Sequence, residues 1–251
     1  MKKRLDVILV DKGIVESREK AQALILSANV LVNEKPITKC GQQVDENVDI
    51  RIKEKIPYVS RGGLKLEKAL EVFKVNPQGL VCIDVGSSTG GFTDVLLKRG
   101  AVKVFAVDVG TNQLAYTLRK DPRVISMEKV NARALKKEMF EAEIDLAVID
   151  VSFISLTLIL ESVKSVLRNK QMVALVKPQF EVGESIDGFK GVVKEKEDMF
   201  NAIEKCIVFA ETIGLYCKSA CVSPIKGPKG NTEFFIYLTE EKNNFDFRKL
   251  I

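Results

Sequence analysis

The 251-residue sequence predicts an α/β fold with a doubly wound, mostly parallel sheet, preceded by a small α+β unit. Three observations predict this arrangement. Continuous apolar segments of strand length alternate with amphipathic helical segments from residue 61 onward, which is typical of a parallel sheet covered on both faces. A glycine-rich turn follows the first of these strands. The beginning of the chain has a different pattern, with short helices and short strands.

The chain divides by its pattern into two parts. Residues 1–55 are expected to form a small N-terminal unit, and residues 61–251 are expected to form the α/β domain. Pro57 interrupts regular structure between them, so residues 56–60 are expected to be a linker. Two helices and short strands in 55 residues make a poor core by themselves.

The small unit has helical spacing of apolar residues in two places. The first lies at residues 5–9, where three apolar side chains share one face. Ser17 can N-cap a second helix. The apolar stripe of that helix is Ala21, Leu24, Ile25 and Ala28. Short strands are expected at residues 30–32 and 48–52, joined by a polar loop.

The larger domain alternates between the two element types. Strands are expected near residues 80–84, 102–107, 124–126, 146–149 and 172–176. Helices are expected at residues 64–73, 92–99, 112–119, 132–139 and 156–168. A long helix at 195–213 and two final strands, 216–222 and 233–238, are expected to close the edge of the sheet.

Composition limits the class of protein. The net charge of +5 is mildly basic and compatible with a polyanionic partner, without establishing one. Five scattered cysteines and no histidine predict a reduced, cytoplasmic protein with no metal site. Asp6 and Asp11 interrupt what would be the apolar core of a leader peptide. The longest uncharged run, residues 21–33, is too short to span a bilayer, so no membrane association is expected.

The segment CIDVGSSTGGFTDVLL, residues 82–97, predicts a nucleoside site. Phe92 stands where a P-loop has its phosphate-binding lysine, and Ser88 replaces the second glycine of the dinucleotide fingerprint. The turn therefore favours a cofactor with a nucleoside end and no phosphates, S-adenosylmethionine over NAD. Asp108, at the end of the next strand, can accept both ribose hydroxyls, or it merely caps a turn.

Four further polar residues occupy positions that a simple core does not explain. Asp150 and Lys177 end successive strands, Lys65 lies on the helix before the sheet, and Glu233 opens the last strand. With no histidine, a lysine beside a carboxylate is suited to deprotonating a sugar hydroxyl, which then attacks a methyl group held in line. The simpler alternatives are that Lys65 and Glu233 are surface charges and that Lys177 pairs structurally with Asp150.

The N-terminal segment RLDVILVDKGIVESREKAQALILSANVLVNEKPI resembles the small RNA-binding module of a ribosomal protein, pseudouridine synthases and bacterial tyrosyl-tRNA synthetases. Asn29 stands where that module usually has a glycine, and asparagine tolerates the left-handed conformation expected there. The resemblance implies contacts with RNA phosphates. The residues implied are Arg4, Arg18, Lys20 and Lys35, with Arg61 added from the larger domain.

The motifs of the larger domain resemble the TlyA (hemolysin A) family. They are SRGGLKL, DVGSSTGGFTD, VDVGTNQLA, VNAR, IDVSFISL, LVKPQFEVG and SPIKGPKGNTEFF. The resemblance implies a Rossmann-like catalytic domain of the FtsJ/RrmJ type that methylates cytidine 2′-hydroxyls of ribosomal RNA with S-adenosylmethionine. It implies that Lys65, Asp150, Lys177 and Glu233 are the catalytic Lys-Asp-Lys-Glu tetrad. The implied partner is ribosomal RNA or a ribosomal subunit.

The cofactor-binding residues expected from the glycine turn and these motifs are Asp84, Gly86, Ser87, Ser88, Thr89, Gly90, Gly91, Phe92, Asp108 and Asn131. Two rival functions remain open. One is the pore-forming protein that the name hemolysin implies, which the absence of an export signal and of a membrane span disfavours. The other is a non-catalytic RNA-binding factor that retains a cofactor pocket.

Overall fold

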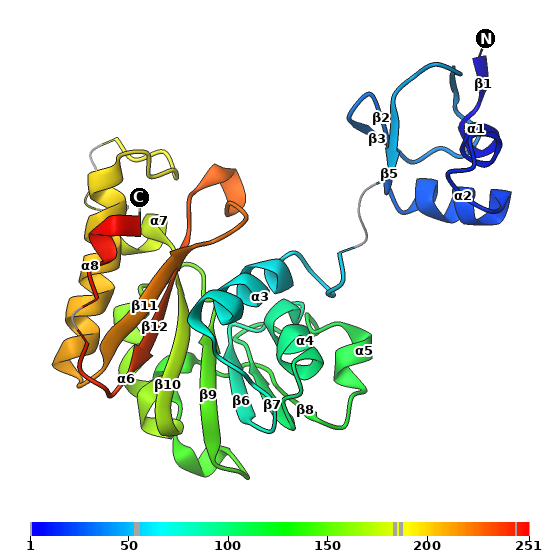
Figure 1. The fold of residues 1–251 in the computed structure, drawn as a ribbon. Helices are drawn as coiled ribbons and strands as arrows, with labels where there is room; N and C mark the ends of the chain where they lie inside the picture. Colours follow the sequence, from blue (N-terminus) through cyan, green and yellow to red (C-terminus); the bar gives the residue numbers. More distant parts are fainter. Residues whose placement is uncertain (1, 53–55, 183–184, 186–187, 244, 251) are drawn as a thin grey trace. The chain divides into compact units, whose positions relative to one another are not determined.

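The computed structural model describes residues 2–52, 56–182, 185, 188–243 and 245–250. The chain forms two compact units, residues 1–55 and residues 56–251 (Figure 1). Each unit has its own hydrophobic core.

The small unit combines two helices with two small antiparallel sheets. The helices are α1 (Leu5–Asp11) and α2 (Arg18–Leu26). One sheet has the order β3 (Lys35–Ile37), β2 (Val30–Val32), β5 (Ile50–Ile52), and in the other β1 (Lys2–Arg4) pairs with β4 (Gln43–Asp45). The apolar faces of the helices meet the sheets in a core of Leu5, Ile8, Leu9, Ala21, Ile25, Val30, Val32 and Val44.

Both helices of this unit were predicted, and Ser17 is the N-cap of α2, where its hydroxyl accepts a hydrogen bond from the backbone N–H of Lys20 at 3.2 Å. The prediction of a polar loop between the strands at 30–32 and 48–52 was wrong in part, because this segment contains β3 and β4. These three-residue strands are too short to produce an alternating pattern in sequence.

The left-handed residue after α2 is Ala28, with φ of 56°, and not Asn29 as predicted. The N–H groups of Ala28 and Asn29 donate to the carbonyls of Ile25 and Leu24, both at 2.9 Å. This pair of bonds is a Schellman motif, which fixes the left-handed conformation at the first residue beyond the C-cap. The position of the C-cap, Ser27, therefore decides which residue is left-handed.

The larger unit is built on one seven-stranded sheet. Its strands are β6 (Val81–Val85), β7 (Lys103–Val107), β8 (Val124–Met127), β9 (Ile144–Ile149), β10 (Leu167–Val176), β11 (Tyr216–Val222) and β12 (Phe234–Thr239). The spatial order is β11-β12-β10-β9-β6-β7-β8. The five strands from β10 to β8 are parallel, and β12 and β11 form the antiparallel edge, with β12 antiparallel to both β10 and β11. The predicted mostly parallel sheet is confirmed.

Helices cover both faces of this sheet (Figure 1). One face packs against α3 (Gly62–Phe73), α4 (Gly91–Lys98) and α5 (Tyr116–Arg119). The other packs against α6 (Leu160–Val166) and α8 (Lys196–Thr212). Neighbouring residues of β6 belong to different cores: Cys82 lies with the first set of helices and Ile83 with the second. Burial on both faces explains why these strands are continuously apolar in sequence.

Three predicted helices are shorter or broken in the structure. The helix predicted at 112–119 is reduced to α5. Two 3₁₀ turns, Ala132–Ala134 and Lys137–Met139, replace the one predicted at 132–139. They are separated by extended residues, of which Leu135 is buried in the core. The helix predicted at 156–168 is a 3₁₀ turn, Leu156–Leu158, followed by α6. It ends early because β10 begins at Leu167 and pairs with β9, so tertiary pairing overrides the helical periodicity.

The segment expected to be a linker, residues 56–60, lies in the larger unit. The N–H of Val59 donates to Asp94 of α4 at 2.9 Å. The ring of Tyr58 covers Gly63, where an added Cβ would lie 2.4 Å from the ring. Burial raises the pKa of Tyr58 to about 12. Within the residues that the structure describes, no helix is both long enough and apolar enough to cross a membrane.

The direction in which successive strands are added to the sheet reverses at β6. The chain passes from β6 to β7 on one side, and β9 returns to pair on the other. Ligands of open α/β sheets bind beyond the carboxyl ends of the strands at such a point. The turn after β6 is the predicted nucleoside loop.

Candidate active site

The glycine turn between β6 and α4 lies against the residues that follow β9. Gly86 has φ of +84°, and a Cβ there would lie 2.4 Å from the carbonyl oxygen of Asp150. Only glycine allows this approach, which brings the ends of two neighbouring strands together. Gly90 also has positive φ, and an added Cβ there would lie 2.3 Å from the side chain of Leu118. Gly90 lines neither of the two cavities, whereas its neighbours Thr89 and Gly91 line the first.

Two cavities adjoin at this edge of the sheet. The first, of about 320 Å³, is lined by most of the segment 84–92 together with side chains from α3 and from the ends of β9 and β10. The second, of about 600 Å³, is lined by the segments 107–109, 130–133 and 150–154. Gly86, Ser88, Asp150 and Ser152 line both. The site therefore consists of two neighbouring compartments with a shared wall.

The second cavity contains Asp108 and Asn131, both expected at the cofactor. The carboxylate of Asp108 accepts backbone hydrogen bonds from Ser88 at 2.8 Å and from Gly110 at 2.7 Å. Asp108 thus caps a turn and also faces the cavity, so the two alternatives are compatible. A carboxylate has about four acceptor positions, which leaves capacity for ribose hydroxyls.

Asp84 is fully buried at the end of β6 and lines the first cavity. Its Oδ2 accepts a 2.6 Å hydrogen bond from the hydroxyl of Thr93, whereas Oδ1 has no partner among the described residues. Burial raises the pKa of this carboxyl to about 7. A buried acceptor without a donor is costly, about 1–3 kcal/mol. The arrangement fits a ligand that carries a cationic donor such as an ammonium group.

The four residues of the predicted tetrad form two lysine–carboxylate pairs. Lys177 Nζ lies 2.6 Å from Asp150 Oδ1, and Lys65 Nζ donates to Glu233 Oε2 at 2.5 Å. The first pair forms because β9 and β10 are adjacent and parallel, so the residues that follow them are neighbours. The second pair joins α3 to the start of β12.

Three members of the tetrad line the first cavity, and Glu233 does not. Glu233 contacts Lys65 on the side away from the cavity. Its side chain is 0% exposed, and that of Lys65 is 11% exposed. They are therefore not surface charges. Glu233 Oε1 has no hydrogen-bond partner in the described chain, and a Cβ on Gly227 would lie 2.1 Å from it. Gly227 is thus the residue that leaves space for this carboxylate.

Two residues that the sequence did not single out belong to the site. Ser152 accepts a 2.9 Å hydrogen bond from Lys177 Nζ and lines both cavities. Phe153 lines the second cavity with φ of +64° and 90% of its surface exposed. Its ring centroid is 5.1 Å from that of Phe180. Both follow Asp150 in IDVSFISL, but a left-handed, exposed phenylalanine cannot be recognised from the letters alone.

The residues predicted to contact RNA are distributed over both units. Arg61 lines the first cavity at the start of α3. Arg4 and Arg18 both bind the buried carboxylate of Asp6. Lys20 forms an ion pair with Glu16, and Lys35 is exposed on β3. Among the residues that the structure describes, no cluster of His, Cys, Asp or Glu could hold a metal ion.

Comparison with known proteins identifies both units. The FtsJ-like methyltransferase family model matches residues 58–240, and the S4 domain model matches residues 3–50. The "Putative rRNA methyltransferase YqxC" of Bacillus subtilis is 45% identical over 240 residues, covering 94% of this chain and 85% of YqxC. The "16S/23S rRNA (cytidine-2'-O)-methyltransferase TlyA" of Mycobacterium tuberculosis is 41% identical over 238 residues, covering 94% of this chain and 89% of TlyA.

A solved structure, "Putative hemolysin from Streptococcus thermophilus", is 45% identical with a TM-score of 0.74 and covers 95% of this chain and 88% of that one. These matches extend over both units and confirm the resemblance drawn from the motifs. The chain belongs to the FtsJ-like methyltransferase family and, within it, to the TlyA proteins that carry an S4 domain.

Proposed function

We propose that this protein methylates the 2′-hydroxyl of a cytidine in ribosomal RNA, with S-adenosylmethionine as the methyl donor. The observation that supports it best is a pair of lysine–carboxylate contacts on a cavity that adjoins a nucleoside-sized compartment. The related TlyA of M. tuberculosis is named for this reaction.

The donor would occupy both compartments. Asp108 and Asn131 line the compartment suited to its nucleoside, and Asp84 offers an unpaired oxygen to its ammonium group. Gly86 and Ser88 lie on the shared wall between them. When bound, the donor supplies an electrophilic methyl group on a positively charged sulfur.

Lys177 is the proposed proton acceptor. In its amine form, Nζ takes the proton of the 2′-hydroxyl, and the ammonium so formed is stabilised by Asp150 Oδ1 at 2.6 Å. Ser152 Oγ, 2.9 Å from Nζ, restricts where that nitrogen points. Fixing the amine beside the hydroxyl contributes through alignment, and general-base assistance adds about 10²–10⁴-fold.

Lys65 and Phe153 are proposed to hold the substrate nucleotide. Glu233 fixes the Lys65 ammonium by a 2.5 Å hydrogen bond, so its other N–H groups can be directed at oxygens of the ribose or the phosphate. Phe153 is an exposed ring beside the second cavity, and stacking of a base on an aromatic ring contributes about 1–3 kcal/mol.

The S4 unit is proposed to bind the RNA outside the catalytic cavity. The S4 domain spans residues 3–50, and this segment has exposed arginines and lysines but no aromatic residue. It is therefore suited to phosphates more than to unpaired bases. The place of action would be the cytoplasm, and the partner ribosomal RNA or a ribosomal subunit.

The decisive experiment compares Lys177→Ala with Lys103→Ala. Lys103 forms an ion pair with Glu141 and lines neither cavity, so it is a matched lysine control. Ribose methylation of in vitro transcribed 16S and 23S rRNA is mapped by mass spectrometry in single-turnover reactions. Lys177→Ala should lower the rate by about 10²–10⁴-fold, and Lys103→Ala should not change it.

Cofactor affinity, measured by calorimetry with S-adenosylhomocysteine, should stay within a few fold in both variants. A near-normal rate in Lys177→Ala would show that this lysine is structural. If the wild-type chain binds rRNA but transfers no methyl group, the protein is a non-catalytic RNA-binding factor instead.

A further inference from the structure

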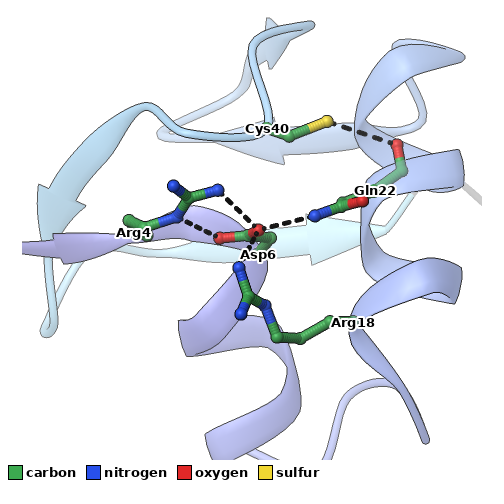
Figure 2. Close-up of polar contacts among 5 residues, drawn as sticks. All are labelled: Arg4, Asp6, Arg18, Gln22 and Cys40. Atoms are coloured by element: carbon green, nitrogen blue, oxygen red, sulfur yellow. Dashed lines mark hydrogen bonds and ion pairs between the residues drawn. The ribbon is translucent and has the colours of Figure 1, made fainter.

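Asp6 is a fully buried carboxylate on the first turn of α1, in the small unit (Figure 2). Arg4 donates to both of its oxygens, from Nε at 3.0 Å and Nη2 at 2.9 Å. Arg18 and Gln22, both on α2, donate to Oδ2 at 3.1 Å and 3.0 Å. These donors, above all Arg4, hold the pKa of Asp6 well below its usual range.

The two arginines reach Asp6 from different elements and remain exposed. Arg4 ends β1 and Arg18 begins α2, and the exposed fractions of their side chains are 47% and 55%. Nη1 of Arg4 and both Nε and Nη1 of Arg18 have no hydrogen-bond partner within the described part of the chain. Arg4 is therefore fixed along one edge by two hydrogen bonds to Asp6, Arg18 is held by one, and both guanidinium groups are open to solvent elsewhere.

The loop at residues 40–41 lies beside Arg4. An added Cβ on Gly41 would lie 3.7 Å from the guanidinium carbon of Arg4, so the loop passes beside this guanidinium. The Cys40 thiol lies 3.6 Å from the carbonyl oxygen of Gln22, as a weak hydrogen-bond donor, and so connects this loop to α2 (Figure 2). The Arg4 guanidinium is thus held by Asp6 of α1, the carboxylate that α2 also binds, and it lies beside a loop that is itself connected to α2.

Stability alone does not account for this cluster. Burying a carboxylate is costly, and an apolar residue of similar size often stabilises a protein as well as a buried ion pair does. Charge alone does not explain RNA binding either, because residues 1–60 contain 11 Lys/Arg and 9 Asp/Glu. With so small an excess, affinity for a polyanion must come from where particular cations are held.

We propose that Asp6 is a positioning residue that holds Arg4 and Arg18 as a preassembled pair for RNA backbone phosphates. A guanidinium binds phosphate with two parallel N–H donors, and fixing it beforehand reduces the entropy lost on binding. The phosphate would be bound by the N–H edges that Asp6 leaves free. This inference rests on the proposed function, because it assumes that the S4 unit contacts RNA.

The proposal predicts an effect of opposite sign to simple electrostatics. Asp6→Asn removes one negative charge, which would strengthen RNA binding if Asp6 only repelled phosphate. In our proposal, however, the NH₂ group of the asparagine replaces a carboxylate oxygen that accepts hydrogen bonds from the arginines. An NH₂ group cannot accept them, so Arg4 and Arg18 lose their orientation. We expect about tenfold weaker binding of in vitro transcribed 23S rRNA by the full-length chain, and a salt slope lower by about 0.7–0.9 for each phosphate that is no longer bound.

Asp11→Asn is the matched control. Asp11 ends the same helix, is half-exposed and forms an ion pair with Lys3 at 2.6 Å, so its replacement removes the same charge from the same unit without touching the arginines. Its RNA affinity should be equal to wild type or higher. Hydrogen exchange of peptides from residues 1–55 shows whether the small unit stays folded in each variant.

A second variant covers the case in which Asp6→Asn unfolds the unit. Arg4→Lys with Arg18→Lys keeps both charges but loses the two-pronged geometry, and it should also bind about tenfold more weakly. The proposal is overturned if a folded Asp6→Asn variant binds as tightly as Asp11→Asn, or if the double lysine variant binds like wild type. Failure of the proposed function looks different: wild type would then bind no rRNA, or bind it without methyl transfer.

Discussion

Replacing Asp84 by asparagine should make the larger unit more stable at alkaline pH and a poorer cofactor binder. The carboxyl is fully buried, with one oxygen bonded to Thr93 and the other unpaired in the described chain, and its pKa is raised from 3.8 to about 7. The difference of about three pKa units corresponds to roughly 4 kcal/mol for ionising it in the folded state.

The sign follows from proton binding. Between about pH 4 and pH 7 the folded protein holds a proton on Asp84 that the unfolded chain has lost, so stability falls as pH rises through this window. Above about pH 7 Asp84 is ionised in the folded protein too, and the full free-energy cost of burying its charge is present. The asparagine of the Asp84→Asn variant does not ionise, so this cost is absent. The free energy of unfolding of the variant should therefore match that of wild type near pH 4 and exceed it at about pH 8 by up to roughly 4 kcal/mol. For a unit of this size that is about 8–16 °C in Tm.

Tyrosine fluorescence measures this unit alone. All four tyrosines, Tyr58, Tyr116, Tyr216 and Tyr237, lie in residues 56–251, and the chain has no tryptophan. Thermal unfolding at about pH 5 and pH 8 gives the stability, and calorimetry with S-adenosylhomocysteine should give about 10–100-fold weaker binding, the loss of one charge-assisted hydrogen bond. An Asp84→Asn variant with the pH dependence of wild type would refute the reasoning.

Three other changes test other parts of the structure. Deleting residues 1–55 should weaken rRNA binding and flatten its salt dependence in filter-binding assays, because fewer phosphates are bound, while cofactor binding measured by calorimetry stays the same; an unchanged salt slope contradicts an RNA-binding role for the S4 unit. Ala28→Gly should stabilise that unit by about 0.5–1 kcal/mol, since Ala28 has φ of 56°, and slower hydrogen exchange in residues 1–55 would show it. Gly227→Ala should displace Glu233, because the new Cβ lies 2.1 Å from Oε1, and lower kcat by about 10²-fold. An unchanged kcat for Gly227→Ala would mean that the position of Glu233 is not needed.

The sequence by itself was sufficient for the architecture of the larger unit. Apolar strands buried on both faces differ in period and length from the helices between them, so β6, β7, β9 and β12 could be predicted within about two residues. The polar residues at strand ends were equally visible, because a carboxylate after an apolar run, as at Asp150, has no role in a core.

Only the tertiary structure decided how those polar residues combine. That Glu233 lies behind Lys65 rather than on the cavity depends on how β12 enters the sheet beside β10, a pairing of residues far apart in sequence. The same holds for Asp6, whose neighbours in sequence suggested only an interrupted apolar segment. Its partners Arg18 and Gln22 come from another helix, and burial of their shared carboxylate follows from packing that no local pattern records.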